Sequence, residues 1–165
     1  GDLGATPRNI GIAQARGDYL MFIDDDDWYL PGALATVRKS CREQPGRAFL
    51  YRMYQPYRRH LVVWSARSLR LGNIGTPMFV CPRTPAGVAT WQSHWGHDLD
   101  FVADTLRLLG MPVVWRPEII ACVGHGNDDP FAATAAPTGM RKALGLALAR
   151  LRIAAAAWWP SRGAV

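Results

Sequence analysis

Residues 19–27 read Tyr-Leu-Met-Phe-Ile-Asp-Asp-Asp-Asp, an apolar run that ends abruptly in four aspartates. Five consecutive apolar residues are typical of a strand that is covered on both faces, and they fit an edge strand less well. In open α/β sheets, ligands bind at the carboxyl ends of the strands, where these four carboxylates would lie. The stretch therefore predicts an α/β fold with a ligand site at one edge of its sheet.

Periodic patterns on both sides extend this prediction. Thr6 and Pro7 form an N-cap and first-turn signal for a helix that runs to Ala15, and Pro31 opens a second helix. Short β-like runs follow at residues 48–54, 61–65 and 78–81. The sequence then predicts a helix with Asp98 as its N-cap, and strands at residues 113–115 and 119–123.

The composition indicates a globular protein. The chain has 165 residues, 49% of them hydrophobic and 19% charged, which suits one domain that can bury a core without disulfides. Three cysteines, an odd number with no CxxC pair, favour neither a disulfide framework nor a cysteine zinc site. No signal peptide is visible, and the absence of an initiator Met suggests a start inside a longer reading frame or a processed start.

The charge is distributed unevenly. The net charge is +6, and residues 38–83 hold ten basic residues but a single acidic one, Glu43. This imbalance favours anionic partners such as phosphates, nucleic acid or a membrane surface, although it also serves solubility.

The last part of the chain is expected to be a basic helix rich in Ala and Leu. We divide the chain into a domain over residues 1–138 and this helical region over residues 139–165. Arg150 and Arg152 interrupt the apolar runs, so a membrane span is not expected. Either peripheral contact with a membrane surface or coverage of the core with a solvated basic face would suit such a helix.

The four adjacent aspartates suggest a metal site. Their mutual repulsion is most easily relieved by a hard divalent cation with oxygen ligands, Mn²⁺ or Mg²⁺. The alternative is a solvated acidic turn that caps the helix beginning near Pro31.

Residues 8–34 resemble the central motif of glycosyltransferase family 2. The matching elements are an Arg-Asn-x-Gly helix, Gly-Asp-Tyr, an apolar strand, the acidic DXD-type signature and a Pro-x-x-Leu helix, and here they are Arg8–Gly11, Gly17–Tyr19, residues 20–23, Asp24–Asp27 and Pro31–Leu34. The resemblance implies a GT-A-like (Rossmann-like) three-layer α/β/α sandwich. It also implies an inverting transfer of sugar from a nucleotide-sugar donor, with a UDP-sugar favoured, to a saccharide or other hydroxyl acceptor.

Two downstream segments fit the same resemblance. Gly-His-Asp-Leu-Asp-Phe at residues 96–101 is similar to the family's Gly-Glu-Asp-x-Asp segment, which implies that Asp98 is the catalytic base. His97 stands where the family has Glu. Gly-His-Gly-Asn at residues 124–127 resembles a His-containing loop near the diphosphate and the metal. For Asp98, the alternative is a helix N-cap without chemistry.

The resemblance assigns further roles residue by residue. The metal ligands would be Asp24, Asp26 and His125. The residues expected to bind substrate are Arg8, Asn9, Asp24, Asp25, Trp91, Trp95 and His97. Trp91 and Trp95 are candidates for stacking on a sugar, and the alternative for both is a packed anchor of their loop. The cytoplasm, with contact at the inner face of the membrane, is the expected location.

The sequence also departs from the family pattern. The family fold places one or two strands and part of the nucleotide pocket before the Arg-Asn-x-Gly helix, whereas seven residues precede Arg8 here. We therefore expect a truncated domain with an exposed sheet edge and a tendency to self-associate. The alternative function is a non-catalytic remnant or interaction module of this fold.

Two other site types fit parts of the sequence. His94, His97 and His125, with Asp98, could in principle hold zinc. Arg58-Arg59-His60 and seven scattered tryptophans could suggest a nucleic-acid or membrane-surface module. Because no recognition motif accompanies them, nucleic-acid binding is not expected.

Overall fold

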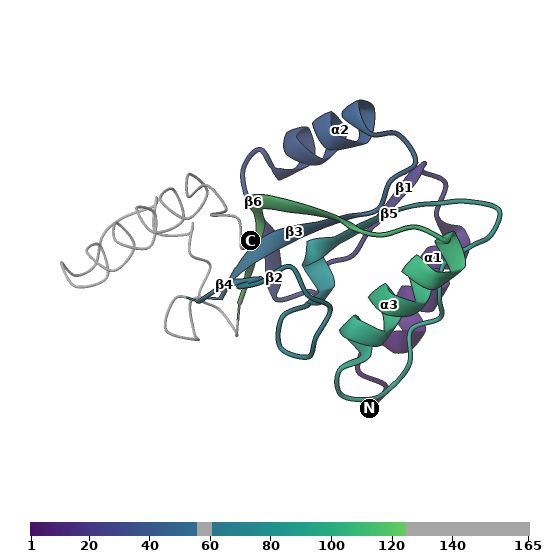
Figure 1. The fold of residues 1–165 in the computed structure, drawn as a ribbon. Coiled ribbons are helices and arrows are strands. Elements are labelled where there is room, and N and C mark those ends of the chain that lie inside the picture. Colours follow the sequence, from purple (N-terminus) through teal and green to yellow (C-terminus); the bar gives the residue numbers. More distant parts are fainter. Residues whose placement is uncertain (56–60, 125–165) are drawn as a thin grey trace, which may run out of the picture.

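The computed structural model describes residues 1–55 and 61–124 (Figure 1). The helix expected over residues 140–159, the loop after Gly124 with His125, and the Arg58-Arg59-His60 cluster lie outside the described residues. The proposed boundary at residues 138 and 139 also lies outside them.

The described chain alternates helices and strands as the sequence predicts. In order they are α1 (Ala5–Gln14), β1 (Tyr19–Met21), β2 (Asp27–Tyr29), α2 (Ala33–Glu43), β3 (Phe49–Gln55), β4 (Leu61–Val63), the 3₁₀ turn η1 (Thr76–Met78), β5 (Phe79–Pro82), α3 (His97–Leu109) and β6 (Val114–Val123).

The strands form one mixed sheet in the order β1-β5-β3-β6-β2, with β4 paired to β3 outside this path. β3 and β6 run parallel, with Leu50 opposite Trp115, and the other pairs are antiparallel. Helix α2 lies on one side of the sheet, and α1 and α3 lie on the other (Figure 1). The predicted three-layer α/β/α architecture is therefore confirmed.

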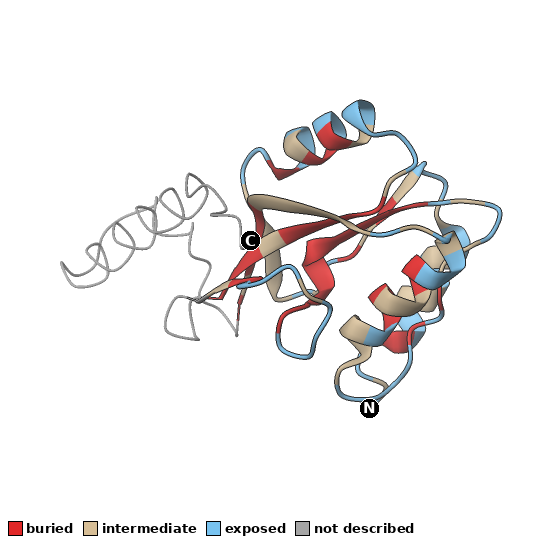
Figure 2. Ribbon diagram, viewed as in Figure 1, coloured by how far each residue is buried: buried red, intermediate tan, exposed pale blue. Residues whose placement is uncertain are grey.

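The core lies around the central strand β3. Phe49, Leu50 and Tyr51 have no solvent-exposed surface, and the buried colour follows β3 through the sheet (Figure 2). On the side of α3, Trp91 stacks on Phe101 with ring centroids 4.1 Å apart. Stacked aromatic pairs of this kind add about 0.5–1.5 kcal/mol beyond the area that they bury. The cluster fixes α3 against the sheet, and α3 carries the predicted base.

The prediction of a strand over residues 19–23 that is covered on both faces was wrong. β1 has three residues and is an edge strand whose partner is β5. The apolar run leaves the ladder after Met21, and Phe22 packs edge-to-face against Trp91 and Phe101. The run stays apolar beyond the end of β1 because Phe22, which follows the strand, packs into the core.

The aspartate run contributes a strand that the sequence did not predict. Asp27, Trp28 and Tyr29 form β2, which pairs antiparallel with β6. Trp28 and Tyr29 favour strands but Asp27 does not, and three residues after an acidic run are too few to form a recognisable strand pattern. The Tyr29 hydroxyl donates to the Phe22 carbonyl at 2.8 Å, which closes the turn that contains Asp24, Asp25 and Asp26.

Two other boundaries differ from the prediction. Residues 114–123 form one strand, β6, where two were expected, because register shifts opposite Arg52 accommodate the irregular part around Pro117. Helix α1 starts at Ala5 with Gly4 as N-cap, and the Asp2 carboxylate accepts from the Gly4 and Thr6 amides. Thr6 is therefore not the N-cap. Within residues 1–55 and 61–124, no helix is long and apolar enough to cross a membrane.

Candidate functional site

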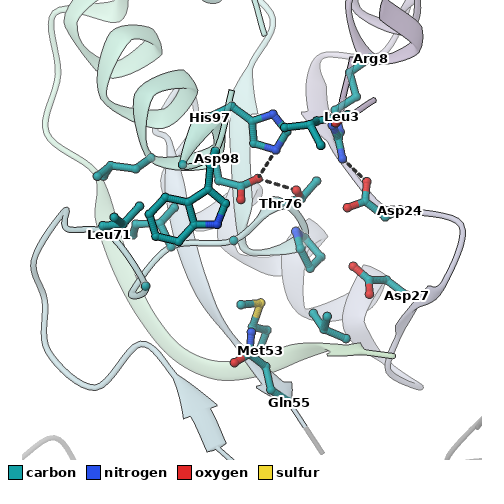
Figure 3. A pocket seen from close by; sticks show the side chains of 18 residues that line it. Leu3, Arg8, Asp24, Asp27, Met53, Gln55, Leu71, Thr76, His97 and Asp98 are labelled. Atoms are coloured by element: carbon teal, nitrogen blue, oxygen red, sulfur yellow. Dashed lines mark hydrogen bonds and ion pairs between the residues drawn. The ribbon is translucent and has the colours of Figure 1, made fainter. Parts of the chain in front are cut away.

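One pocket of about 380 Å³ brings together residues from both ends of the described chain. It opens where β3 and β6 end and where β2 and α3 begin, with Arg8 of α1 along one wall (Figure 3). Its polar lining side chains are Arg8, Asp24, Asp27, Gln55, Thr76, His97 and Asp98, and its apolar ones include Leu3, Met53, Leu71 and Trp95.

Asp98 occupies the second position of α3 and points into the pocket. The Thr76 hydroxyl donates to Asp98 Oδ1 at 2.5 Å, and His97 Nε2 lies 3.9 Å from the same oxygen (Figure 3). The N-cap of α3 is Gly96, which has a φ of 89°, and no side chain caps the helix. The N-cap interpretation of Asp98 is therefore wrong, and its carboxylate faces the pocket.

The surroundings of Asp98 make its carboxylate more basic. Burial raises the pKa of Asp98 and the charge of Asp24 adds to the rise, while the Thr76 hydroxyl, His97 and Arg8 act in the opposite direction. A carboxylate whose pKa lies closer to neutrality is a better acceptor for the proton of a reacting hydroxyl.

His97 is fixed by its second ring nitrogen. Nδ1 lies 3.1 Å from the Gln92 carbonyl. Because a carbonyl oxygen only accepts, Nδ1 carries the proton in this contact and Nε2 faces Asp98. The ring of Trp91 also packs edge-to-face on His97 at 5.4 Å. His97 therefore borders the carboxylate in a set orientation.

Arg8 and Asp24 form an ion pair along the pocket wall (Figure 3). Arg8 also donates to the Leu3 carbonyl at 2.8 Å, and its guanidinium lies 4.7 Å above the ring of Trp91. Three contacts from different parts of the chain thus hold the guanidinium in place. The resemblance implied that Arg8 and Asp24 both serve the substrate, and the structure brings them together.

The aspartate run divides between pocket and surface. Asp24 and Asp27 line the pocket, whereas Asp25 is exposed and neither Asp25 nor Asp26 is among the lining residues. Burial and the charges of Asp24 and Asp26 raise the pKa of Asp27 to about 7, although the Gly124 amide donates to its carboxylate at 3.2 Å. Burial is the larger cause of this rise, and the negative charge concentrated at the start of β2 adds to it.

The donor set at this position suits a hard divalent cation. Among the described residues, no group of three His, Cys, Asp or Glu side chains is arranged to hold a metal ion, and the predicted ligand His125 lies outside them. Magnesium-type sites commonly use one or two carboxylates and complete their shell with water and substrate phosphates. Asp24 and Asp26 carry oxygen donors of this type, and of the two only Asp24 lines the pocket.

The described histidines do not converge on a zinc ion. His94 Nε2 lies 2.6 Å from Asp100 Oδ2, while the His97 ring contacts the Gln92 carbonyl and faces Asp98. These separate partners remove the basis of the zinc alternative within residues 1–55 and 61–124.

Asn9 and Trp91 hold the fold together next to the pocket. Asn9 Oδ1 accepts from the Trp91 amide at 2.9 Å, and Asn9 Nδ2 donates to the Trp91 carbonyl at 3.0 Å. Trp91 is 3% exposed and is not part of the pocket lining. The structure thus corrects the assignment of Trp91 to sugar stacking, because its ring is packed inside the core and is not exposed to a ligand in the pocket. Trp95, 79% exposed, does line the pocket.

Sequence reasoning missed three polar residues of the pocket as individual site residues. Asp27 was part of the aspartate run, but its place in the pocket follows from its pairing with Val123. Thr76 meets Asp98 from 22 positions away, and Gln55 reaches the pocket as the last residue of β3. No local motif marks either residue, so only the tertiary structure could find them.

Comparison with known proteins shows which family and which solved structure this chain resembles. Residues 4–81 match the model of the family described as "Glycosyl transferase family 2". An "Uncharacterized glycosyltransferase" of Haemophilus influenzae is 36% identical over 47 residues, which are 28% of this chain and 16% of that protein. The crystal structure of S. aureus TarS 1-349 aligns with a TM-score of 0.50 and 14% identity, covering 73% of this chain and 40% of that one.

The fold is thus α/β and GT-A-like, and at 14% identity the likeness to TarS concerns the fold alone. Residues 4–81, just under half of the chain, match glycosyltransferase family 2. The family match spans α1 to β5 and includes Arg8 and the aspartate run, whereas Asp98 lies beyond it. The chain corresponds to less than half the length of either protein that it resembles.

Proposed function

We propose that this chain transfers a sugar from a nucleotide-sugar donor to a hydroxyl acceptor, with inversion at the anomeric carbon and with Mn²⁺ or Mg²⁺. One observation carries the proposal. Asp98, a partly buried carboxylate with a raised pKa, lines the same pocket as Asp24 and Asp27 of the aspartate run. A base and an anionic metal-type site at the two sides of one pocket are the groups that this reaction needs.

Asp98 is the proposed catalytic base. Its carboxylate takes the proton of the acceptor hydroxyl while the acceptor oxygen forms a bond to the anomeric carbon. The bond from that carbon to the diphosphate breaks on the opposite face, and its electron pair leaves with the diphosphate. The hydrogen bond from Thr76 holds the carboxylate in one position beside His97, which reduces the entropic cost of reaching the reactive geometry.

The leaving diphosphate requires positive charge. A divalent cation bound by Asp24 and Asp26 would act there as a Lewis acid. Arg8 contributes its guanidinium from α1, since its position is already set by Asp24, Leu3 and Trp91. A uridine diphosphate sugar is the proposed donor, and exposed Trp95 at the pocket is the proposed contact for a saccharide ring.

The decisive test is Asp98→Asn, which keeps the shape of the side chain and removes its basicity. Release of UDP from UDP-sugars in the presence of Mn²⁺ and mixed saccharide acceptors should fall by about 10²–10⁴-fold, the usual contribution of a general base. Donor binding, measured by calorimetry, should persist in the variant.

Asp100→Asn is the matched control, because Asp100 lies on the same helix and pairs with His94 at the surface. Its turnover should remain close to that of the wild type. Equal rates for Asp98→Asn and the wild type would rule out Asp98 as the base. A folded wild-type chain that binds UDP but turns over none of the sugars would favour the non-catalytic alternative.

A further inference from the structure

The side chain of Gln55 presents an unused hydrogen-bonding group in the pocket. Gln55 is the last residue of β3, is 7% exposed and lines the pocket. Its Oε1 atom is buried and has no hydrogen-bond partner among residues 1–55 and 61–124, which the structure describes. Buried polar atoms in native proteins are nearly always paired, so an exception at a pocket wall indicates a partner supplied by a ligand.

Two other polar side chains of the lining, Thr76 and His97, already have hydrogen-bond partners in the protein. The hydroxyl of Thr76 donates a hydrogen bond to Asp98. In their ionised form, the carboxylates of Asp24, Asp27 and Asp98 only accept hydrogen bonds, whereas the carboxamide of Gln55 both accepts and donates at any pH. A sugar hydroxyl has the same dual character, so it can donate to Oε1 and accept from Nε2 of one carboxamide.

The sheet register places Gln55 close to the proposed diphosphate site. Tyr54 of β3 pairs with Cys122 of β6, so Gln55 lies beside Val123, and Val123 pairs in turn with Asp27 of β2. Two strand spacings, about 10 Å, therefore separate the backbones of Gln55 and Asp27. In Figure 3, Gln55 and Met53 lie at the end of the pocket away from His97 and Arg8. A group attached to a diphosphate at Asp24 and Asp27 can reach this end.

We infer that the Gln55 carboxamide binds a hydroxyl group of the donor's sugar and so helps to select that sugar. This inference rests on the proposed function, since it assumes that a nucleotide sugar occupies the pocket. It assigns Gln55 to the sugar and not to the nucleotide. The two can be told apart by comparing the affinity for UDP with the affinity for UDP-sugars.

The test compares UDP with UDP-sugars on Gln55→Leu, which keeps the size of the side chain but cannot form hydrogen bonds. Calorimetry with Mn²⁺ first finds which of UDP-glucose, UDP-galactose and their N-acetylhexosamine counterparts binds the wild-type chain most tightly. Gln55→Leu should weaken binding of that UDP-sugar by about 10- to 100-fold, the scale of one lost polar contact in a desolvated site. Its affinity for UDP should stay within about twofold of the wild type.

Two further measurements guard against a structural explanation. The melting temperature of ligand-free Gln55→Leu should equal or exceed that of the wild type, because the substitution removes a buried oxygen without a partner. Gln44→Leu is the matched control, since Gln44 is an exposed glutamine at the end of α2, and it should leave both affinities unchanged.

The outcomes separate the two proposals. If the wild type binds UDP-sugars and Gln55→Leu binds them equally well, or loses UDP to the same extent, the assignment of Gln55 is wrong while the proposed function stands. A large fall in melting temperature would likewise overturn it by showing that Gln55 supports the fold. If the folded wild type binds neither UDP nor any UDP-sugar, the proposed function fails and the assignment of Gln55 fails with it.

Discussion

At the scale of single residues, the contact between Thr76 and Asp98 sets the character of the site. The hydroxyl of Thr76, itself 7% exposed, supplies a hydrogen bond that favours the charged form of the carboxylate, whereas burial favours the neutral form. Burial is the larger effect, so the pKa of Asp98 is raised. The base is therefore active above this raised pKa and loses activity as the pH falls through it.

Thr76→Val tests this balance. Without the hydroxyl, the pKa of Asp98 should rise further, because one interaction that stabilises the carboxylate is lost. The acidic limb of the pH profile of kcat/KM should therefore move to higher pH, and the free energy of unfolding should fall by about 1 kcal/mol. The profile is measured by UDP release, with Asp24, Arg8 and His97 unchanged around the base.

Thr76→Ser is the matched control for this prediction, because it keeps the hydroxyl. Its acidic limb should coincide with that of the wild type. An unshifted limb in Thr76→Val would mean that Thr76 does not tune Asp98.

Which site residues can be predicted from the sequence depends on how far apart along the chain the contacting residues lie. Asp98 and the aspartate run could be found because each lies in a local pattern. Their neighbours could not, since Thr76 meets Asp98 and Asn9 meets Trp91 across 22 and 82 positions. Trp91 was misassigned for the same reason: nothing near it in sequence shows that Phe101 and Arg8 cover its two faces.

At the scale of elements, Asn9 joins α1 to the loop that precedes α3. Its side chain pairs with both the amide and the carbonyl of Trp91, much as a neighbouring strand would. This contact fixes the loop against α1 and leaves the Trp91 ring directed at Phe101. Asn9, a residue of the Arg-Asn-x-Gly motif, thus stabilises the loop that contains Trp91 and does not line the pocket.

Asn9→Ala should lower the free energy of unfolding by about 2 kcal/mol, because two hydrogen bonds are lost and the Trp91 backbone groups are left with no partner. Urea unfolding measures the change. Gln14→Ala, an exposed position at the end of the same helix, should alter it by less than about 0.5 kcal/mol. A similar small effect for both variants would show that the two contacts with Trp91 contribute little.

The elements themselves were predictable to different degrees. α2 and α3 were found because their apolar residues recur with helical spacing, and α1 from the start signal at Thr6 and Pro7. β3 was found because apolar and aromatic residues dominate its seven positions. β2 was missed since its three residues become a strand only by pairing with β6. Among the described residues β1 lies at one edge of the sheet, and a strand of three residues offers a short template for further pairing.

At the scale of the whole molecule, ligand binding should be visible as stability. A ligand present at 100 times its Kd stabilises the folded state by about 2.7 kcal/mol. For a chain of this size, UDP with Mn²⁺ should therefore raise the melting temperature by roughly 5–10 °C. Chelation of the metal by EDTA should reverse most of this rise.

Asp26→Asn should abolish the ligand-induced rise, because it removes a proposed metal ligand without breaking the ion pair between Arg8 and Asp24. Asp18→Asn, an exposed acidic position just before β1, should retain the full rise. An undiminished rise in Asp26→Asn would remove this residue from the metal site.

The parallel pairing of β3 with β6 has a consequence for biosynthesis. Leu50 finds its partner Trp115 only 65 positions later, and β2 finds β6 at a still greater separation. Pairings of such long range close late, after shorter-range contacts have formed. A growing chain that has passed the family-matched residues 4–81 therefore carries the aspartates and Arg8 but not yet the wall that encloses them. Binding competence should arise in a single late event, when β6 has left the ribosome.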